Sequence, residues 1–310
     1  MKIAFLNKYQ NKVNRGAETY VLELSKRFSK NHKVDVISDV NYFSLLKNDY
    51  DLIIPTNGRL QAILVRIITW LKRSKVVISG QSGKGLDDRI NLCTFPNYFV
   101  ALSSKALNWA RKVNPFVKLV YIPNGVDINK FKPEGEKFKT NLKSPIILSV
   151  GAFTEQKRHG LVIDAVSKLD NVSLIIAGGG GNLKDELEIK GNKLLGSNRF
   201  QIIEMPYEKM PEVYRSVNLF TLASTPTESF GNVIVEAMAT NLPVVVTNDP
   251  IRKEISGDAG LFADPEDIDS YSKELEKALS LNWEDKPRKQ AEKFDWDKIT
   301  KKYEEILTNL

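Results

Sequence analysis

The sequence NLFTLAS at residues 218–224, followed by ESFGNVIVE at residues 228–236, carries the pattern that decides the fold. The first stretch is a short apolar run typical of a buried β-strand, and residues 233–240 predict an α-helix. A strand that leads through a loop into a helix is the repeating unit of α/β proteins. Glu228 therefore falls in a strand-to-helix loop, and Glu236 lies a turn into the helix.

The loop contains Gly231 and Asn232 at the amino end of the predicted helix. Backbone N–H groups there lack partners inside the helix, and the helix dipole favours an anion. The pattern therefore predicts a phosphate site with two carboxylates beside it that can bind sugar hydroxyls. In a chain that is 27% charged, spacing alone leaves a simpler interpretation open, in which Glu228 is a loop charge and Glu236 a solvated helix residue.

Outward from this stretch, predicted strands and helices alternate, as in doubly wound parallel sheets. In the first half we expect strands at residues 2–6, 33–38, 52–55, 76–79, 99–102 and 119–122, and helices at residues 17–29, 60–72 and 104–112. In the second half we expect strands at residues 146–150, 173–177, 200–204, 219–222, 244–247 and 260–262. The sequence predicts an α/β protein with two Rossmann-like doubly wound domains.

The stretch between the two halves is rich in Lys, Asn, Pro and Gly and has no sustained apolar period, which indicates a linker. We expect an N-terminal domain at residues 1–124, the linker at 125–145, a C-terminal domain at 146–294 and a terminal helix at 295–310. Ligands of such sheets bind beyond the carboxyl ends of the strands. The two domains are therefore expected to face each other across a cleft that holds the ligand.

Length and composition fit a two-domain enzyme, since 310 residues with 42% hydrophobic content can bury two cores. A single cysteine, Cys93, excludes an internal disulfide and fits a reducing cytoplasm. The two histidines, His32 and His159, lack metal-site spacing, so no metal is expected. No apolar run reaches about 18 residues, and the start turns polar too soon for a secretory signal. We expect a cytoplasmic protein.

The net charge of +7 and pI near 9.2 favour acidic partners, such as nucleotide diphosphates, anionic glycans or an anionic membrane surface. No arginine-rich arm, basic-aromatic interleaving or zinc finger is present, so no nucleic-acid partner is expected. The predicted helix at residues 60–72 is apolar over much of its surface and basic toward its end. It is either a buried crossover helix or a surface in peripheral contact with an anionic membrane, at the inner membrane face.

Residues 224–231, STPTESFG, and 235–239, VEAMA, together resemble the E-x7-E signature of the retaining GT-B glycosyltransferases, specifically glycosyltransferase family 4. Other segments resemble further motifs of that family in the expected order: PNGVD at 123–127 with Phe131, SVGAF at 149–153 with Lys157, IIAGGG at 175–180 and MPEVYRS at 210–216. The resemblance is strong over residues 120–310 and weaker before them, where it rests mainly on Gly16-Ala17-Glu18. In the family, the terminal helix crosses back onto the first domain, and we expect the same here.

The resemblance implies transfer of a sugar, with retention of configuration, from a nucleotide diphosphate to a glycan or lipid-linked acceptor. A UDP or GDP sugar is the expected donor, and assembly of a cell-surface polysaccharide, glycolipid or glycoprotein is the expected role. The departing phosphate is thought to help deprotonate the acceptor, so neither an enzymic nucleophile nor a metal or other cofactor is implied. By position, the catalytic residues would be Glu228 at the sugar hydroxyls, Lys157 at the diphosphate and Gln81 at the donor sugar.

The resemblance also assigns the residues that bind the donor. Glu236 would hold the ribose, and the backbone at Phe230, Gly231, Asn232 and Val233 would hold the phosphates. The remaining candidates are Gly16, where backbone would approach the diphosphate, Arg158 beside Lys157, and the nucleobase-packing residues Met205, Pro206 and Tyr207. A plain turn explains Gly16 as well, and a strand-end turn explains Met205 to Tyr207 as well.

The chain departs from the family pattern at two positions. Ala152 stands where an arginine is usual, so Arg158 or Arg15 would have to compensate. Gln81 stands where a histidine often faces the donor sugar, and an amide forms hydrogen bonds but is not protonated near neutral pH. Nearby, Gly83 and Gly85 predict a flexible lip.

These departures keep open a second hypothesis, a non-catalytic sugar-nucleotide-binding protein or partner subunit. A third hypothesis, a dehydrogenase, comes from the glycine run at residues 178–181 after a predicted strand. That run lacks the spaced G-x-G-x-x-G turn, which argues against it.

Overall fold

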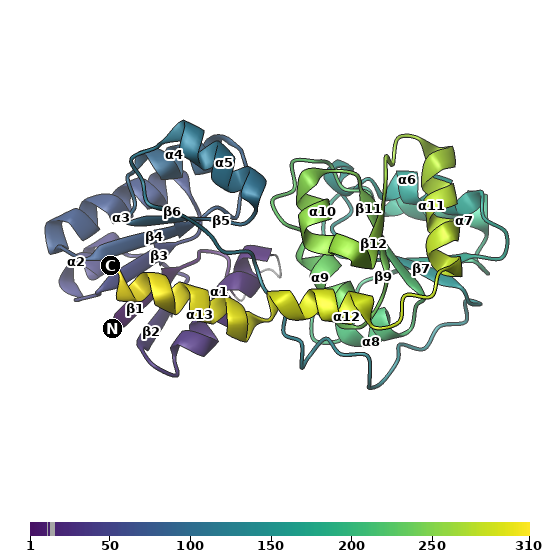
Figure 1. Cartoon of the computed structure of the whole chain (residues 1–310), viewed down its shortest axis with the longest axis horizontal. Coiled ribbons are helices and arrows are strands. Elements are labelled where there is room, and N and C mark those ends of the chain that lie inside the picture. Colours follow the sequence, from purple (N-terminus) through teal and green to yellow (C-terminus); the bar gives the residue numbers. More distant parts are fainter. Residues whose placement is uncertain (11, 13–15) are drawn as a thin grey trace. The chain divides into compact units, whose positions relative to one another are not determined.

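The computed structural model describes residues 1–310 except residues 11 and 13–15. The chain forms two compact units (Figure 1). The first unit comprises Met1–Gly125, Thr227–Phe230 and Phe294–Leu310, and the second comprises Val126–Pro226 and Gly231–Lys293. The first unit therefore contains a short piece of the chain that lies, in sequence, within the second. The linker expected at residues 125–145 stays a prediction.

The first unit is built on a six-stranded sheet in the order β2-β1-β3-β4-β5-β6, with every pair of neighbours parallel. Its strands are β1 (Lys2–Leu6), β2 (Lys33–Ile37), β3 (Leu52–Pro55), β4 (Lys75–Ser79), β5 (Tyr98–Ala101) and β6 (Leu119–Tyr121). Its helices are α1 (Gly16–Phe28), α2 (Tyr42–Lys47), α3 (Arg59–Lys72), α4 (Leu86–Cys93), α5 (Ser104–Val113) and α13 (Trp296–Thr308).

The second unit has a six-stranded parallel sheet in the order β12-β11-β10-β7-β8-β9. Its strands are β7 (Ile146–Val150), β8 (Ser173–Ala177), β9 (Phe200–Ile203), β10 (Leu219–Leu222), β11 (Val244–Thr247) and β12 (Gly260–Ala263). Its α-helices are α6 (His159–Ser167), α7 (Lys184–Leu195), α8 (Met210–Arg215), α9 (Asn232–Ala239), α10 (Pro250–Ser256), α11 (Ile268–Ser280) and α12 (Lys286–Ala291). Short 3-10 helices lie at η1 (Glu155–Lys157), η2 (Gly257–Ala259) and η3 (Glu292–Phe294).

The predicted α/β class with two doubly wound parallel sheets is confirmed. Strands β7, β8, β10 and β11 are buried along their whole length, as expected for parallel strands covered on both faces. Such strands are continuous apolar runs, and for this reason their predicted bounds match the structure. The predicted helices begin and end within one residue of α1, α3, α5 and α9.

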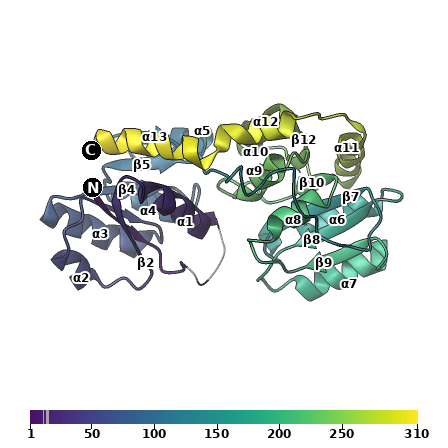
Figure 2. The ribbon, with the colours of Figure 1, turned by 90° about the horizontal axis from the view of Figure 1, so that it is seen from below.

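Two apolar cores cover opposite faces of the first sheet, since alternate strand residues point to opposite sides. Ile3 and Phe5 of β1 join α1 and α13 in one core, whereas Ala4 and Leu6 join α3 in the other. Figure 2 shows α13 and α3 on different sides of this sheet. The terminal helix α13 contributes Trp296, Ile299 and Tyr303, among others, to the first core.

Close packing at Gly125 joins α13 to the end of the PNGVD segment. A Cβ atom added at Gly125 would lie 2.6 Å from Trp296 Cδ2 and 2.9 Å from the Phe294 carbonyl oxygen. The indole of Trp296 is only 1% exposed, so it has no room to move aside. Glycine is therefore required at this position for steric reasons.

The substitution Gly125→Ala is expected to destabilise the first unit by about 1–3 kcal/mol through overpacking. Thermal unfolding followed by circular dichroism measures this effect. Gly160→Ala is the matched control, because the nearest atom to an added Cβ there is Lys190 Nζ at 3.5 Å, an ordinary van der Waals contact. An unchanged midpoint for Gly125→Ala would contradict the steric argument.

Candidate functional site

The second sheet reverses its strand order between β7 and β10, which are parallel neighbours. In doubly wound folds the loops that leave such a pair diverge, and ligands bind at the carboxyl ends of the strands there. The loop after β7 carries Gly151 and Lys157, and the loop after β10 leads to Gly231 and α9. The backbone N–H of Thr225 donates to the Gln156 carbonyl at 3.0 Å, which joins the two loops. The structure thus brings several predicted donor-binding residues to one sheet edge.

Lys157 lies at the end of η1 with its aliphatic stem packed over Gly151. A Cβ atom at Gly151 would lie 3.0 Å from both Cγ and Cδ of Lys157, so a larger residue would displace the stem. The Lys157 N–H donates to the Thr154 carbonyl at 3.0 Å, which fixes the backbone that carries the lysine. Lys157 is half-buried, and a positive charge at this edge suits a diphosphate.

Arg158 binds the protein itself. Its Nε donates to the Ala223 carbonyl at 2.6 Å, Nη2 donates to the Ser224 carbonyl at 3.3 Å, and Nη1 pairs with Glu266 at 2.9 Å. The guanidinium therefore holds the loop after β10. Direct contact of Arg158 with a donor stays a prediction, and Arg15 lies outside the described residues.

A second arginine, Arg252, lies outside every quoted motif and binds the same loop. Arg252 of α10 is fully buried, and its Nη2 donates to Ser224 Oγ at 2.9 Å and to the Thr225 carbonyl at 3.4 Å. Asp249 lies 3.3 Å from its Nη1 and balances the charge. A buried, paired cation under a loop fixes that loop's backbone, because leaving the charge unpaired is unfavourable.

Helix α9 begins at Asn232, and its N-cap is Gly231 with φ of 95°. This left-handed conformation favours glycine, which has no side chain to cap the first turn. Asn232 and Val233 are half-buried, and Phe230 is buried against Phe294 with a ring separation of 5.9 Å. A phosphate site at the amino end of α9 stays a prediction.

Glu236, in the second turn of α9, is only 6% exposed, and Tyr214 Oη donates to its carboxyl at 2.9 Å. Burial raises the pKa of Glu236 to about 7, while hydrogen bonds from Tyr214 and Tyr207 and the charge of Lys130 oppose the rise. Tyr214 itself is fully buried against Phe131. The carboxyl is thus held in a polar niche inside the unit, and the simpler interpretation of a solvated helix residue is wrong for Glu236.

The residues predicted to pack a nucleobase follow β9. Met205 and Tyr207 are half-buried and Pro206 is exposed. The Tyr207 ring packs against Phe131 at 5.7 Å, and the Lys130 ammonium lies 3.7 Å from its centroid, a favourable cation–π distance. Lys130 and Tyr214 were not predicted as site residues, although both lie in or beside the quoted motifs. The structure brings them to Glu236 from distant parts of the chain.

Glu228 belongs to the first unit, together with its neighbours Thr227–Phe230. Glu228 is half-buried, and the adjacent Ser229 Oγ donates to the Gln81 carbonyl at 2.8 Å. The Gln81 side chain pairs with Asn124 through two amide hydrogen bonds of 2.9 and 3.0 Å, and its Nε2 also donates to Ser79 Oγ at 2.9 Å. The segments that carry Glu228 and Gln81, both predicted as catalytic residues, are therefore in direct contact.

The loop after β4 packs against Asp88, which also lies outside every quoted motif. Asp88 is 2% exposed and accepts from Asn91 Nδ2 at 3.1 Å. A Cβ atom at Gly80 would lie 3.0 Å from Asp88 Oδ2, so the loop backbone lies directly over the carboxyl. Burial raises the pKa of Asp88 to about 7.

Gly16 is exposed at the first position of α1. Among the described residues, no group of three or more His, Cys, Asp or Glu side chains is placed to hold a metal ion. No helix in the same part of the chain is long and apolar enough to cross a membrane.

The raised pKa of Glu236 predicts a pH-dependent stability. Since the folded pKa of about 7 exceeds the ordinary 4.5, the folded protein binds this proton more tightly between these values, and stability falls as pH rises through them. Glu236→Gln should remove this part of the decline. The free energy of unfolding of the variant, relative to the parent, should therefore be roughly 1–3 kcal/mol higher at pH 8 than at pH 4.5, as derived from thermal unfolding at each pH. Asp88 contributes equally in both proteins and cancels. Parallel midpoint-versus-pH curves would exclude this account of the buried carboxyl.

A family model described as "Glycosyl transferases group 1" matches residues 131–295. Among curated proteins, O-antigen chain mannosyltransferase B of Escherichia coli is 36% identical over 101 residues, which are 31% of this chain and 26% of that protein. The lipopolysaccharide core biosynthesis glycosyltransferase LpsE of Rhizobium meliloti (strain 1021) is 26% identical over 193 residues, 62% of this chain and 54% of that protein. The chain therefore spans about half or less of the length of these relatives.

Solved structures of glycosyltransferases share the fold. Anabaena Alr3699/HepE in complex with UDP and glucose has a TM-score of 0.81 at 19% identity, with 100% of both chains covered. The sucrose-phosphate synthase tll1590 from Thermosynechococcus elongatus also has a TM-score of 0.81, at 16% identity, with 100% of this chain and 98% of that chain covered. The fold is thus GT-B. Since the family model matches more than half of the 310 residues, the chain belongs to the glycosyl transferases group 1 family.

Proposed function

We propose that the protein transfers a sugar from a nucleotide-diphosphate donor to a glycan or lipid-linked acceptor, with retention of configuration. The observation that carries the proposal is the set of groups in the second unit: Lys157 over Gly151, the amino end of α9, and buried Glu236 within that helix. A cation, a helix amino terminus and a carboxylate match the diphosphate and the hydroxyls of a sugar nucleotide.

The proposed donor is a UDP or GDP hexose. Structures of Alr3699/HepE contain UDP, or UDP-glucose, and one curated relative is named a mannosyltransferase. The proposed setting is assembly of a cell-surface polysaccharide, glycolipid or glycoprotein, in the cytoplasm or at the inner face of the membrane. The name of LpsE, a lipopolysaccharide core biosynthesis glycosyltransferase, supports this setting.

In the proposed donor complex, Lys157 and the backbone N–H groups at Phe230 to Val233 hold the diphosphate. Glu236, in its ionised form, accepts hydrogen bonds from the ribose hydroxyls, and the Lys130 charge favours that form. Met205, Pro206 and Tyr207 pack the nucleobase. These groups stabilise negative charge on the diphosphate as it leaves, which is where electrostatic catalysis is strongest.

In the proposed transfer step, the acceptor hydroxyl oxygen bonds to the anomeric carbon while the bond from that carbon to the diphosphate breaks. The hydroxyl proton passes to an oxygen of the departing phosphate. Glu228 binds hydroxyls of the transferred sugar and orients it, and no protein nucleophile takes part.

A second candidate is a donor-binding protein without transfer activity. It is favoured by Gln81, whose amide is hydrogen-bonded to Asn124 and Ser79, and by Ala152 in place of an arginine. This candidate binds the same donors but catalyses neither transfer nor donor hydrolysis, so a turnover assay separates the two.

Thermal-shift screening against UDP, GDP and ADP sugars tests the donor assignment. A matching donor at one hundred times its Kd should stabilise the protein by about 2.7 kcal/mol, through mass action. Lys157→Gln should raise the Kd for that donor roughly tenfold, because one cation at the diphosphate is lost. The control is Lys168→Gln, which removes a surface lysine paired with Asp269. If no nucleotide sugar shifts the midpoint, the proposal fails.

Transfer kinetics separate the roles of the two glutamates. Glu236→Gln should mainly raise the KM for the donor, whereas Glu228→Gln should mainly lower kcat, each by roughly tenfold or more. Glu188→Gln, at an exposed residue of α7, serves as the control. Parent-like kinetics in both site variants would rule out the assigned roles.

A further inference from the structure

Helix α3 has two apolar faces, only one of which the fold buries. Ala62, Val65 and Ile68 pack into the core beneath the first sheet. The opposite face exposes five large apolar side chains: Leu60 at 65%, Ile63 at 41%, Ile67 at 50%, Trp70 at 75% and Leu71 at 62%. Their spacing of mostly three or four residues places them along one side of the helix. The role of a buried crossover helix therefore explains the apolar residues that face the sheet, but not those on the exposed face.

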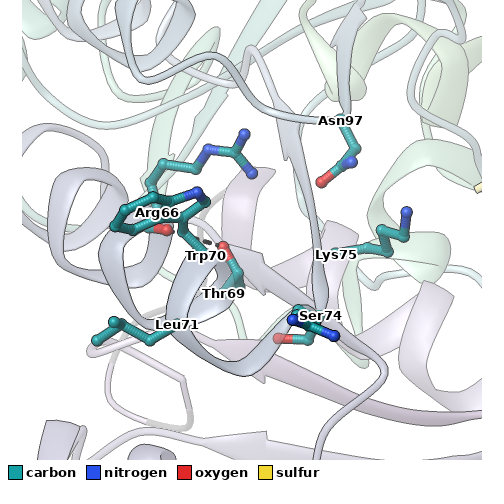
Figure 3. A pocket seen from close by; sticks show the side chains of 8 residues that line it. Arg66, Thr69, Trp70, Leu71, Ser74, Lys75 and Asn97 are labelled. Carbon is teal, nitrogen blue, oxygen red and sulfur yellow. Dashed lines mark hydrogen bonds between the residues drawn. The ribbon is translucent and has the colours of Figure 1, made fainter.

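Basic side chains surround the end of this exposed face. A hollow of about 560 Å³ opens there, lined by Arg66, Trp70, Arg73 and Lys75 among others. Figure 3 shows Arg66 beside Trp70 on one wall and Lys75 with Asn97 on the other. A second hollow shares Lys75 and Asn97 and adds Lys118 and Phe116, the latter 85% exposed. Among the residues that the structure describes, neither lining includes an Asp or Glu.

We propose that the outer face of α3 and these two hollows form a docking surface for an anionic phospholipid bilayer. Leu60, Ile63 and Ile67 enter the boundary between headgroups and acyl chains, and Trp70 sits at the interface, where its amphipathic ring is favoured. Arg66, Arg73 and Lys75 extend past the apolar face to contact lipid phosphates. Apolar area and positive charge on one surface are the two features that such binding requires.

Charge selects the bilayer over a second copy of this chain. A symmetric dimer through α3 would bring the same arginines and lysines of two copies together, in a protein whose net charge is already +7. An anionic lipid surface instead supplies opposite charge over the whole patch.

The orientation of α3 gives this surface a use, in a step that rests on the proposed function. The helix begins at Arg59, directly after β3, so its first turn lies at the carboxyl edge of the first sheet. Ligands of doubly wound sheets bind at that edge. With α3 lying on a bilayer, this edge stands beside the membrane, where a lipid-linked acceptor would be met.

Flotation of the full chain with lipid vesicles, in the absence of any sugar, tests the docking surface. The protein should float with vesicles of phosphatidylcholine mixed with phosphatidylglycerol. With vesicles of phosphatidylcholine alone, it should stay in the bottom fraction of the gradient. The pair Ile67→Ser and Trp70→Ser should reduce binding at least tenfold, and Arg66→Gln with Arg73→Gln should reduce it roughly fivefold per charge. Trp70→Phe should retain binding but lose the blue shift of tryptophan emission that vesicles induce.

The matched controls lie elsewhere on the chain. Ile189→Ser removes a side chain that is 71% exposed on α7, and Lys301→Gln with Lys302→Gln removes two exposed charges from α13, which covers the other face of the sheet. Both controls should bind vesicles as the parent does. The substituted residues are exposed apart from Arg66, which is half-buried, and parent-like thermal midpoints should show that each variant is folded.

Absence of vesicle binding, or binding that the α3 variants leave unchanged, would overturn the inference. A concentration-dependent dimer that Ile67→Ser with Trp70→Ser abolishes, without vesicle binding, would overturn it in favour of a second copy. Donor thermal shifts on the same variants keep the two proposals separate. A retained shift without vesicle binding defeats the docking surface alone, whereas vesicle binding without any donor shift defeats only the proposed function.

Discussion

The parallel direction of every strand is the constraint on which the rest of the molecule depends. In each sheet it collects all carboxyl ends at one edge, so loops from distant parts of the chain begin side by side. In the second unit this edge joins the loop that carries Lys157 to the loop that leads to α9, through the hydrogen bond from the Thr225 N–H to the Gln156 carbonyl. Two arginines then hold the loop between β10 and α9: Arg158 donates to the Ala223 carbonyl, and Arg252 donates to the Ser224 hydroxyl and the Thr225 carbonyl. Scaffold and candidate site are thus one hydrogen-bonded assembly.

Both units contain a buried carboxyl with a raised pKa, and each has a different neighbourhood. Asp88 supports backbone, and its partners are an asparagine and the loop above it. Glu236 is surrounded by hydroxyl and ammonium groups, which stabilise the ionised form if further donors arrive. Under the proposed function, ribose hydroxyls are those donors, so donor binding and loss of a proton from Glu236 are coupled.

Fold class and strand positions could be predicted because buried parallel strands are short apolar runs between turn residues. The immediate motif residues of the site, such as Lys157 and Gly231, could be predicted from the family resemblance. Lys130, Tyr214 and Arg252 could not, because only tertiary packing brings them to Glu236 or to the loop at Ser224. Nor does sequence show that Gln81 pairs with Asn124. For α3, an apolar pattern on nearly all sides cannot indicate which face the sheet will cover.

Helix α13 supplies Trp296, Ile299 and Tyr303, among others, to a core whose remaining members lie between Ile3 and Ile122. A ribosome makes the whole second unit before it makes this helix. Until then, α13 does not pack against this core, and the apolar side chains that it buries, such as Phe5, Tyr20 and Phe28, stay more exposed. The first unit to be translated is therefore the last to complete its core.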